Sequence, residues 1–265
     1  MTTHPELAWS DRFRAIRKLA SRAKPYLLIA IKPDTMVQPR GADHVFAPVR
    51  DRLAQAEPTI AALLRELAPG LARAPAALGR LAENGYFSGG DAFAAYALTQ
   101  HLRPARVIEI GSGHSTHILH QAARDARQPL AITCVDPAPR RDIEAVAHMI
   151  DRRSVLELGP GFADGLAAGD VLFIDGSHYA FNGSDVPFLL LEVLPRLQPG
   201  VVVHVHDIML PYEYTPLFTE RNYNEQYVLA ALLLGGRMVE PLLPVYWLAR
   251  QGRLPAGHSF WMRRV

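Results

Sequence analysis

The stretch VIEIGSGHST, residues 107–116, decides the fold of this chain. Its first residues are mostly apolar and predict a buried strand that carries Glu109 near its end. Gly111 and Gly113 follow, and glycine adopts backbone angles closed to other residues and lets a ligand approach the main chain. The hydroxyl side chains that can cap a following helix are Ser112, Ser115 and Thr116. A turn of this kind at the carboxyl end of a strand predicts a nucleotide-sized binding site.

Three later segments repeat the pattern of an apolar run that ends in polar residues. They are ITCVDP at 132–137, DVLFIDGSH at 170–178 and GVVVHVHDI at 200–208. With the first segment they predict parallel strands whose carboxyl ends share one edge of a sheet. Predicted helices alternate with them at 92–101, 116–126, 141–152, 186–197 and 224–234, and a short strand is predicted at 154–158. The alternation predicts an α/β fold with a doubly wound, mostly parallel sheet that is covered on both faces.

The two ends of the chain follow other patterns. We expect an N-terminal helical extension at 1–85, with helices at 54–67 and 71–81 on either side of Pro69–Gly70, and a main domain at 86–265. The basic amphipathic segment between residues 9 and 24 predicts a helix packed on the domain or on a second subunit of a homodimer, or lying on a membrane surface. The C-terminal segments 238–249 and 259–264 predict two further strands.

Composition limits the classes of function. The chain has 265 residues, 49% of them hydrophobic, which is enough for a sizeable core. A formal net charge of +2 gives no electrostatic reason to expect a nucleic-acid partner. No apolar run approaches the roughly 20 residues that span a bilayer, and the single cysteine, Cys134, cannot form an internal disulfide. We therefore expect a cytoplasmic protein that binds neither nucleic acid nor membrane.

From about Tyr86 onward the chain resembles the class I S-adenosylmethionine-dependent methyltransferases. The resemblance rests on four features: E-I-G-S-G at 109–113, the acidic residue after the second strand, D-G-S-H at 175–178 and H-D at 206–207. Ser115 stands at the usual third glycine, a departure shared with a subgroup that carries E-I-G-S-G-x-S-T and includes small-molecule O-methyltransferases. The resemblance implies a Rossmann-like methyltransferase fold with an antiparallel hairpin at its C-terminus.

The resemblance also implies a set of residues that bind the cofactor. The glycine turn would wrap the methionine part of S-adenosylmethionine, and Asp136 would hold its ribose hydroxyls. Phe162 is expected beside the adenine ring. The full predicted set is Glu109, Gly111, Ser112, Gly113, Ser115, Asp136 and Phe162. Two alternatives stay open: Glu109 only ties down the loop, and Asp136 is only a turn residue.

Four polar residues at the ends of the later strands are the candidates for chemistry. Asp175, His206 and Asp207 are predicted to hold a divalent metal, as the resemblance to catechol-type and sugar O-methyltransferases implies. His206 departs from the acidic residue usual there, and imidazole favours a transition metal over magnesium. The alternative for His206 is a packed strand residue. His178 is expected to act as the general base, or else to cap the next helix.

These residues lead to a prediction of methyl transfer to a hydroxyl group of a small molecule. Tyr212 and Tyr214, in the loop after the fourth segment, are expected to line the acceptor pocket. One alternative is a nicotinamide-dependent oxidoreductase, although its fingerprint requires glycine where Thr116 stands. The other is a binding module that keeps the cofactor site and has no activity.

Overall fold

The four strand segments of the sequence become neighbouring parallel strands. A computed structural model describes residues 40–265, and the predicted amphipathic helix between residues 9 and 24 lies outside them. The strands are β1 (Arg106–Ile110), β2 (Ala131–Val135), β4 (Val171–Ile174) and β5 (Val202–Val205). β1 pairs in parallel with both β2 and β4, and β4 pairs in parallel with β5. The carboxyl ends of all four strands therefore lie along one edge of the sheet.

Three further strands complete the sheet. Within the described residues its order is β3-β2-β1-β4-β5-β7-β6. β3 (Met149–Asp151) is parallel to β2, whereas β7 (Phe260–Arg264) runs antiparallel to both β5 and β6 (Val239–Pro244). The predicted α/β fold with C-terminal antiparallel strands is confirmed. From β1 the chain adds β2 and β3 on one side of the sheet, and it then crosses over to add β4 and β5 on the other side. Open α/β sheets bind ligands at this switch point, which lies between β1 and β4.

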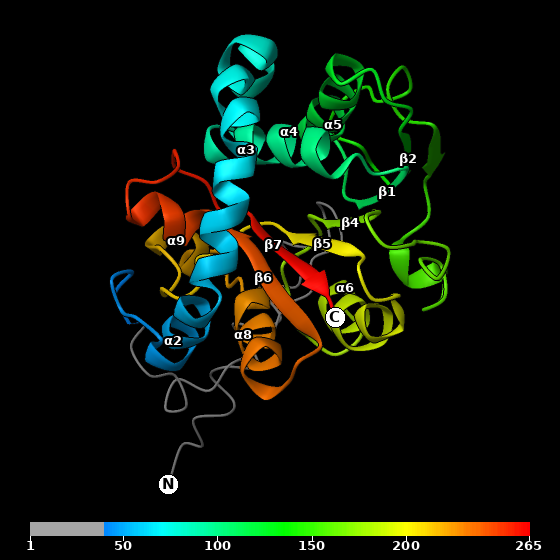
Figure 1. The fold of residues 1–265 in the computed structure, drawn as a ribbon. Coiled ribbons are helices and arrows are strands. Elements are labelled where there is room, and N and C mark those ends of the chain that lie inside the picture. Colours follow the sequence, from blue (N-terminus) through cyan, green and yellow to red (C-terminus); the bar gives the residue numbers. More distant parts are fainter. Residues whose placement is uncertain (1–39) are drawn as a thin grey trace, which may run out of the picture. The chain divides into compact units, whose positions relative to one another are not determined.

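Helices cover both faces of the sheet, which explains its composition. Every residue of β4 and β5 is buried, as strands covered on two sides require. Figure 1 shows α4 (Gly90–Leu102) and α5 (His114–Asp125) on one side of the strands and α8 (Glu225–Gly235) on the other. The predicted helix at 186–197 is present as a continuous helical run that is largely π-helical: α6 (Asp185–Pro187), η4 (Phe188–Val193) and η5 (Leu194–Arg196).

The predicted helix at 141–152 is wrong. Its last residues form β3, which continues the sheet beside β2, and the main chain of His148 begins the pairing with a hydrogen bond to Ile132. The predicted strand at 154–158 is a single 3₁₀ turn, η3 (Val155–Glu157), which is capped by Ser154. The apolar spacing in this segment suits a helix. Its last residues form a strand instead, because they pair with the backbone groups on the open edge of β2.

The predicted break at Pro69–Gly70 is also wrong. After α2 (Ala47–Gln55), one helix, α3 (Glu57–Leu78), runs through both residues and ends at the turn η2 (Gly79–Ala82). Proline removes one backbone hydrogen bond, but the helix packs tightly on α4 at this point. A Cβ atom added to Gly70 would lie 3.0 Å from Cα of Ala97. Gly70 therefore marks a close helix crossing rather than a helix end.

The C-terminal strands are joined differently from a simple hairpin. The predicted strand at 238–249 ends at Pro244, and the chain continues as α9 (Val245–Arg250) before it returns as β7. One more short helix, α7 (Pro216–Glu220), follows β5. Residues 40–265 form one compact unit, and the domain boundary at residue 85 stays a prediction. Among these residues there is no helix of the length and hydropathy needed to cross a membrane.

Candidate functional site

The glycine turn after β1 touches the end of β4. Gly111 has a φ of 77°, in the left-handed region that favours glycine. A Cβ atom added to Gly111 would lie 2.0 Å from the carbonyl oxygen of Asp175. The main chain of Asp175 in turn donates a hydrogen bond of 2.9 Å to Ile110. The turn and the predicted catalytic segment therefore meet at the point where the sheet order reverses.

Glu109 holds the start of α5 against the glycine turn. Its fully buried carboxylate accepts hydrogen bonds of 2.6 Å from Ser115 Oγ and from Thr116 Oγ1. Thr116 Oγ1 also accepts a hydrogen bond from the main chain of Gly113, at 3.0 Å. These contacts are the ones expected from the alternative role of Glu109, in which its carboxylate only holds the loop in place. They also engage the Ser115 hydroxyl with Glu109.

Burial raises the pKa of Glu109 to about 7, even though the hydrogen bonds from Ser115 and Thr116 act in the opposite direction. The folded state therefore binds this proton more tightly than the unfolded chain does, between the ordinary pKa of 4.5 and about 7. The resulting stabilisation is fully present below pH 4.5 and is lost as the pH rises through 7.

We expect Glu109→Gln to abolish this pH dependence. The carboxyl contributes about 3 kcal/mol to the fall in the free energy of unfolding across that pH range. Urea unfolding of both proteins at pH 5 and pH 7.5 measures the difference. The control is Glu144→Gln, since Glu144 is exposed. An identical fall in the wild type and in Glu109→Gln would contradict the expectation.

Asp136 joins the end of β2 to the same turn. Its Oδ2 accepts hydrogen bonds from the main chain and the hydroxyl of Ser112, at 2.7 Å and 2.9 Å. Its Oδ1 accepts one from the main chain of Ala138, at 2.8 Å. The side chain is half-buried. Asp136 is thus placed at the glycine turn, with unused acceptor capacity on Oδ1.

The residue predicted to contact the adenine ring packs against the hydrophobic core. Phe162 is half-buried and stacks on Phe188, with ring centroids 6.5 Å apart. A second aromatic residue, Tyr86, was missed by the sequence analysis. It is 63% exposed, stacks on His114 at the start of α5, and lies beneath the guanidinium group of Arg140. Tyr86 therefore lies at the rim of the glycine turn, a position that its sequence neighbourhood does not reveal.

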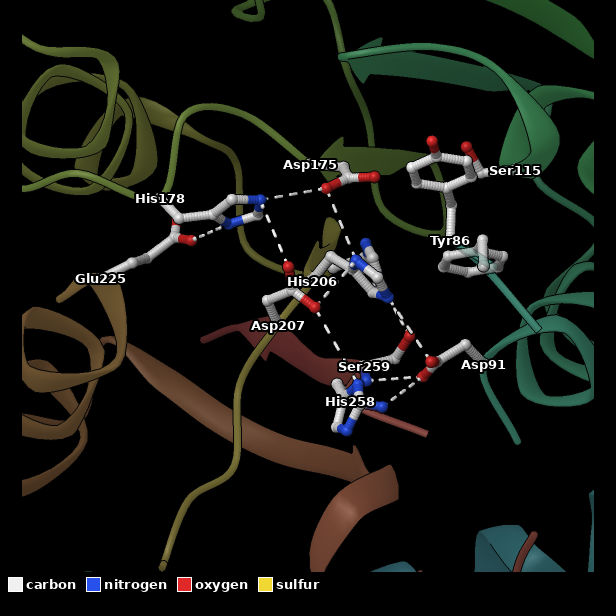
Figure 2. Close-up of polar contacts among 12 residues, drawn as sticks. Tyr86, Asp91, Ser115, Asp175, His178, His206, Asp207, Glu225, His258 and Ser259 are labelled. Atoms are coloured by element: carbon white, nitrogen blue, oxygen red, sulfur yellow. Dashed lines mark hydrogen bonds and ion pairs between the residues drawn. The ribbon is translucent and has the colours of Figure 1, made fainter. Parts of the chain in front are cut away.

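His178 lies between three carboxylates in the cluster that Figure 2 draws. Its Nδ1 is 3.1 Å from Oε2 of Glu225, at the start of α8. Its Nε2 is 3.4 Å from Oδ1 of Asp175 and 3.5 Å from Oδ2 of Asp207. The imidazole is buried, and the main chain of Asn224 donates a hydrogen bond to the carbonyl of His178. The start of α8 therefore positions both the backbone and the ring of His178.

His206 is the second histidine of the cluster. Its Nδ1 lies 3.5 Å from Oδ1 of Asp175 and 3.5 Å from Oδ1 of Asp207. Its Nε2 lies 3.4 Å from Oδ2 of Asp91, in the first turn of α4. Figure 2 shows both histidines pointing toward the pair of aspartates. The structure therefore brings together all four residues predicted for the chemistry.

The carboxylates dominate the electrostatics of this cluster. Burial by itself lowers the pKa of His206, but the charges of Asp207 and Asp175 outweigh it and raise the pKa well above its usual value. The same balance, with Asp175 and Glu225 as partners, raises the pKa of His178. As the side chains stand, no group of three or more His, Cys, Asp and Glu residues in the range 40–265 is arranged to hold a metal ion.

Two residues of the cluster have strained backbones. His178 has a φ of 65° and Asp207 a φ of 56°. Residues other than glycine seldom adopt this left-handed conformation, and such residues concentrate at functional sites. The loops after β4 and β5 thus hold two of the predicted residues in place at a conformational cost.

The predicted acceptor residues lie in different surroundings. Tyr214 is buried, and its hydroxyl accepts a hydrogen bond from the main chain of Gln226. Tyr212 packs on Tyr246 and lies beneath Arg250. The ring that contacts His178 is instead Tyr223, with centroids 4.4 Å apart. Tyr223 belongs to the aromatic loop of the sequence, but spacing alone could not select it.

Comparison with known proteins agrees with this geometry. Residues 108–208 match the family model described as a methyltransferase domain. The matched segment runs from the first strand to the His206–Asp207 pair, so it contains the glycine turn and the predicted catalytic residues. This part of the chain is therefore similar to a methyltransferase domain. None of the curated protein sequences matches the chain.

The chain is also similar to solved structures at low identity. An O-methyltransferase from Bacillus cereus in complex with SAH is 13% identical, with 95% of this chain and 97% of that chain covered and a TM-score of 0.44. A SAH-bound methyltransferase from Podospora anserina is 17% identical (66% and 77% covered, TM-score 0.42). A methyltransferase from Geobacter sulfurreducens is 14% identical (73% and 88% covered, TM-score 0.41).

Proposed function

We propose that the protein transfers a methyl group from S-adenosylmethionine to a hydroxyl oxygen of a small molecule. One observation carries the proposal. The glycine turn after β1 is in contact with the end of β4, which presents Asp175 and, three residues later, His178. A cofactor held by the turn would therefore have its methyl group near the cluster. In the reaction the acceptor oxygen bonds to the methyl carbon, the carbon–sulfur bond breaks, and S-adenosylhomocysteine leaves.

The cofactor would bind along the edge formed by β1 and β2. The glycine turn leads directly into α5, and the N-terminus of a helix favours a carboxylate. Asp136 would hold the ribose through Oδ1, and Phe162 would contact the adenine. Glu109 and Ser115 would act indirectly, by fixing the conformation of the turn through their hydrogen bond of 2.6 Å.

A divalent cation between Asp175, His206 and Asp207 is part of the proposal. Nδ1 of His206 lies 3.5 Å from an oxygen of each aspartate, beyond the roughly 2.8 Å of a charge-assisted hydrogen bond. The spacing is close to the roughly 3.4 Å between two tetrahedral ligands of one ion. The donor types suit a cation, but as the side chains stand among the described residues they form no ligand set, so the cation would require them to turn. When bound, the ion would lower the pKa of the acceptor hydroxyl.

His178 would act on the hydroxyl proton. Glu225 holds Nδ1, so Nε2 faces the carboxylates of Asp175 and Asp207. A cation held by Asp175 would reduce part of the charge that raises the pKa of His178, and Nε2 would then be available to accept the hydroxyl proton. Glu225 supports this role in the way that a carboxylate orients a catalytic imidazole.

The acceptor is proposed to be a compact molecule with an apolar part. Tyr223 covers the ring of His178 and packs on Phe218. Tyr212 and Tyr214, earlier in the same loop, are the further proposed contacts. The test is transfer of a labelled methyl group from S-adenosylmethionine to a panel of sugar and phenolic hydroxyl compounds. Labelled product supports the proposal, and cofactor binding without transfer to any hydroxyl in the panel counts against it.

Asp136→Ala is expected to weaken S-adenosylhomocysteine binding at least tenfold. The variant removes a charged acceptor, each of whose hydrogen bonds is worth roughly 1.5–3 kcal/mol. Isothermal calorimetry measures the dissociation constant. Glu240→Ala, which removes an exposed carboxylate from β6, is the control and should bind as the wild type does. Equal affinity in all three proteins would remove Asp136 from the cofactor site.

A further inference from the structure

An aromatic residue and a basic residue that the proposed function leaves unused meet beside the glycine turn. Tyr86 lies just before α4, and Arg140 belongs to the loop after β2. A Cβ atom added to Gly113 would lie 3.9 Å from Cβ of Arg140. The guanidinium carbon of Arg140 lies 5.1 Å from the centre of the Tyr86 ring. The Arg140 side chain therefore extends from the glycine turn to Tyr86.

The ring of Tyr86 is held against the first residue of α5. It stacks on the imidazole of His114, with ring centroids 6.0 Å apart and an angle of 21° between the planes. In Figure 2 the ring lies on the same side of the polar cluster as Ser115. Tyr86 is 63% exposed, so the described part of the chain leaves much of the ring uncovered. A fixed but uncovered aromatic ring at this position can support a charged side chain that binds a ligand.

The positive charge of Arg140 differs from that of the arginines near it. Nη1 of Arg141 donates a hydrogen bond of 3.0 Å to Nδ1 of His114. Arg152, which lines the same surface hollow of about 430 Å³, pairs with Glu144 at 3.2 Å. In the described part of the chain no carboxylate pairs with Arg140, whose guanidinium group contacts the Tyr86 ring. A guanidinium group on a ring face keeps N–H donors at its edge, where they can bind an anion.

We propose that Arg140 binds the carboxylate in the methionine part of S-adenosylmethionine, and that Tyr86 is a positioning residue that holds the guanidinium group beside the glycine turn. The inference rests on the proposed function, which brings this cofactor to the turn. The carboxylate is the one anionic group of the cofactor, and an arginine binds a carboxylate through hydrogen bonds roughly twice as strong as those between neutral groups. The start of α5 favours the same group, so the helix and Arg140 would act on it together.

The test compares the binding of S-adenosylmethionine with that of its decarboxylated form, which lacks only the carboxylate. Calorimetry gives both dissociation constants, and the wild type is expected to bind S-adenosylmethionine at least about tenfold more tightly. Arg140→Ala should weaken S-adenosylmethionine about tenfold and leave the affinity for the decarboxylated form unchanged, so that most of the preference is lost. Arg152→Ala is the matched control, because that arginine lines the same hollow and is already paired; it should bind both ligands as the wild type does.

Two further variants test the positioning role of Tyr86. Tyr86→Phe keeps the ring and should bind both ligands as the wild type does, whereas Tyr86→Leu should weaken S-adenosylmethionine alone. Wild-type affinity in Tyr86→Leu would overturn the role of Tyr86. The role of Arg140 is overturned if Arg140→Ala keeps the full preference for the carboxylate, or if it weakens both ligands equally. Failure of the proposed function gives a different result, because the wild type would then bind neither ligand, and both proposals would fall.

Discussion

Replacement of His178 by alanine is expected to lower turnover by about 10²-fold or more, with no change in the affinity for S-adenosylhomocysteine. The imidazole is the proposed acceptor of the hydroxyl proton, and Glu225 fixes its orientation from 3.1 Å. The cofactor residues belong to other strands, so their contacts survive the change. Steady-state kinetics with the identified acceptor, together with calorimetry, measure both quantities.

The backbone of His178 requires a second variant for this experiment. Its φ of 65° is strained for alanine, whereas asparagine tolerates the left-handed region. His178→Asn should therefore fold at least as well as His178→Ala and show the same loss of turnover. His101→Ala, at the exposed end of α4, is the control for loss of a histidine. Wild-type turnover in His178→Asn would give His178 a structural role only.

Gly111→Ala is expected to weaken S-adenosylhomocysteine binding by at least about 30-fold. The left-handed conformation alone costs an alanine roughly 1–2 kcal/mol. The new Cβ would also lie 2.0 Å from the carbonyl oxygen of Asp175, so the turn or the end of β4 must move. Either movement separates the cofactor turn from the catalytic segment. Calorimetry gives the affinity, and thermal unfolding gives the stability of the same sample.

Gly85→Ala is the control for this glycine substitution. It lies in an open turn, with no atom within 4 Å of the added Cβ, and should leave both affinity and stability unchanged. If Gly111→Ala binds as tightly as the wild type, the cofactor does not use the turn after β1.

The polar residues at the carboxyl edge of the sheet could be predicted because the sequence features that indicate them are local. Each central strand is an apolar run that ends in a polar residue, and parallel pairing then brings Glu109, Asp136 and Asp175 to one edge whatever the helices do. The segment at 141–152 shows the limit of this reasoning. Its spacing suits a helix, and only the free edge of β2 makes residues 149–151 a strand.

The residues behind the two histidines could not be predicted. Asp91 and Glu225 are acidic residues in the first turns of α4 and α8, where an acid commonly does no more than stabilise the helix end. Their roles arise from the docking of those helices against loops more than 40 residues away, as in the contact between His178 and Glu225. The sequence held one signal. Both residues are followed by mostly apolar helical segments, which places these helix starts against the core.

The most direct test of the central claim is a calorimetric titration of the purified protein with S-adenosylmethionine and, separately, with NADH. We expect S-adenosylmethionine and its demethylated product to bind with micromolar-range affinity and NADH to give no heat of binding. Asp136→Ala should weaken the first two titrations and leave the third unchanged. Tight binding of NADH, with no response to S-adenosylmethionine, would contradict the account and identify the domain as one that binds a nicotinamide cofactor.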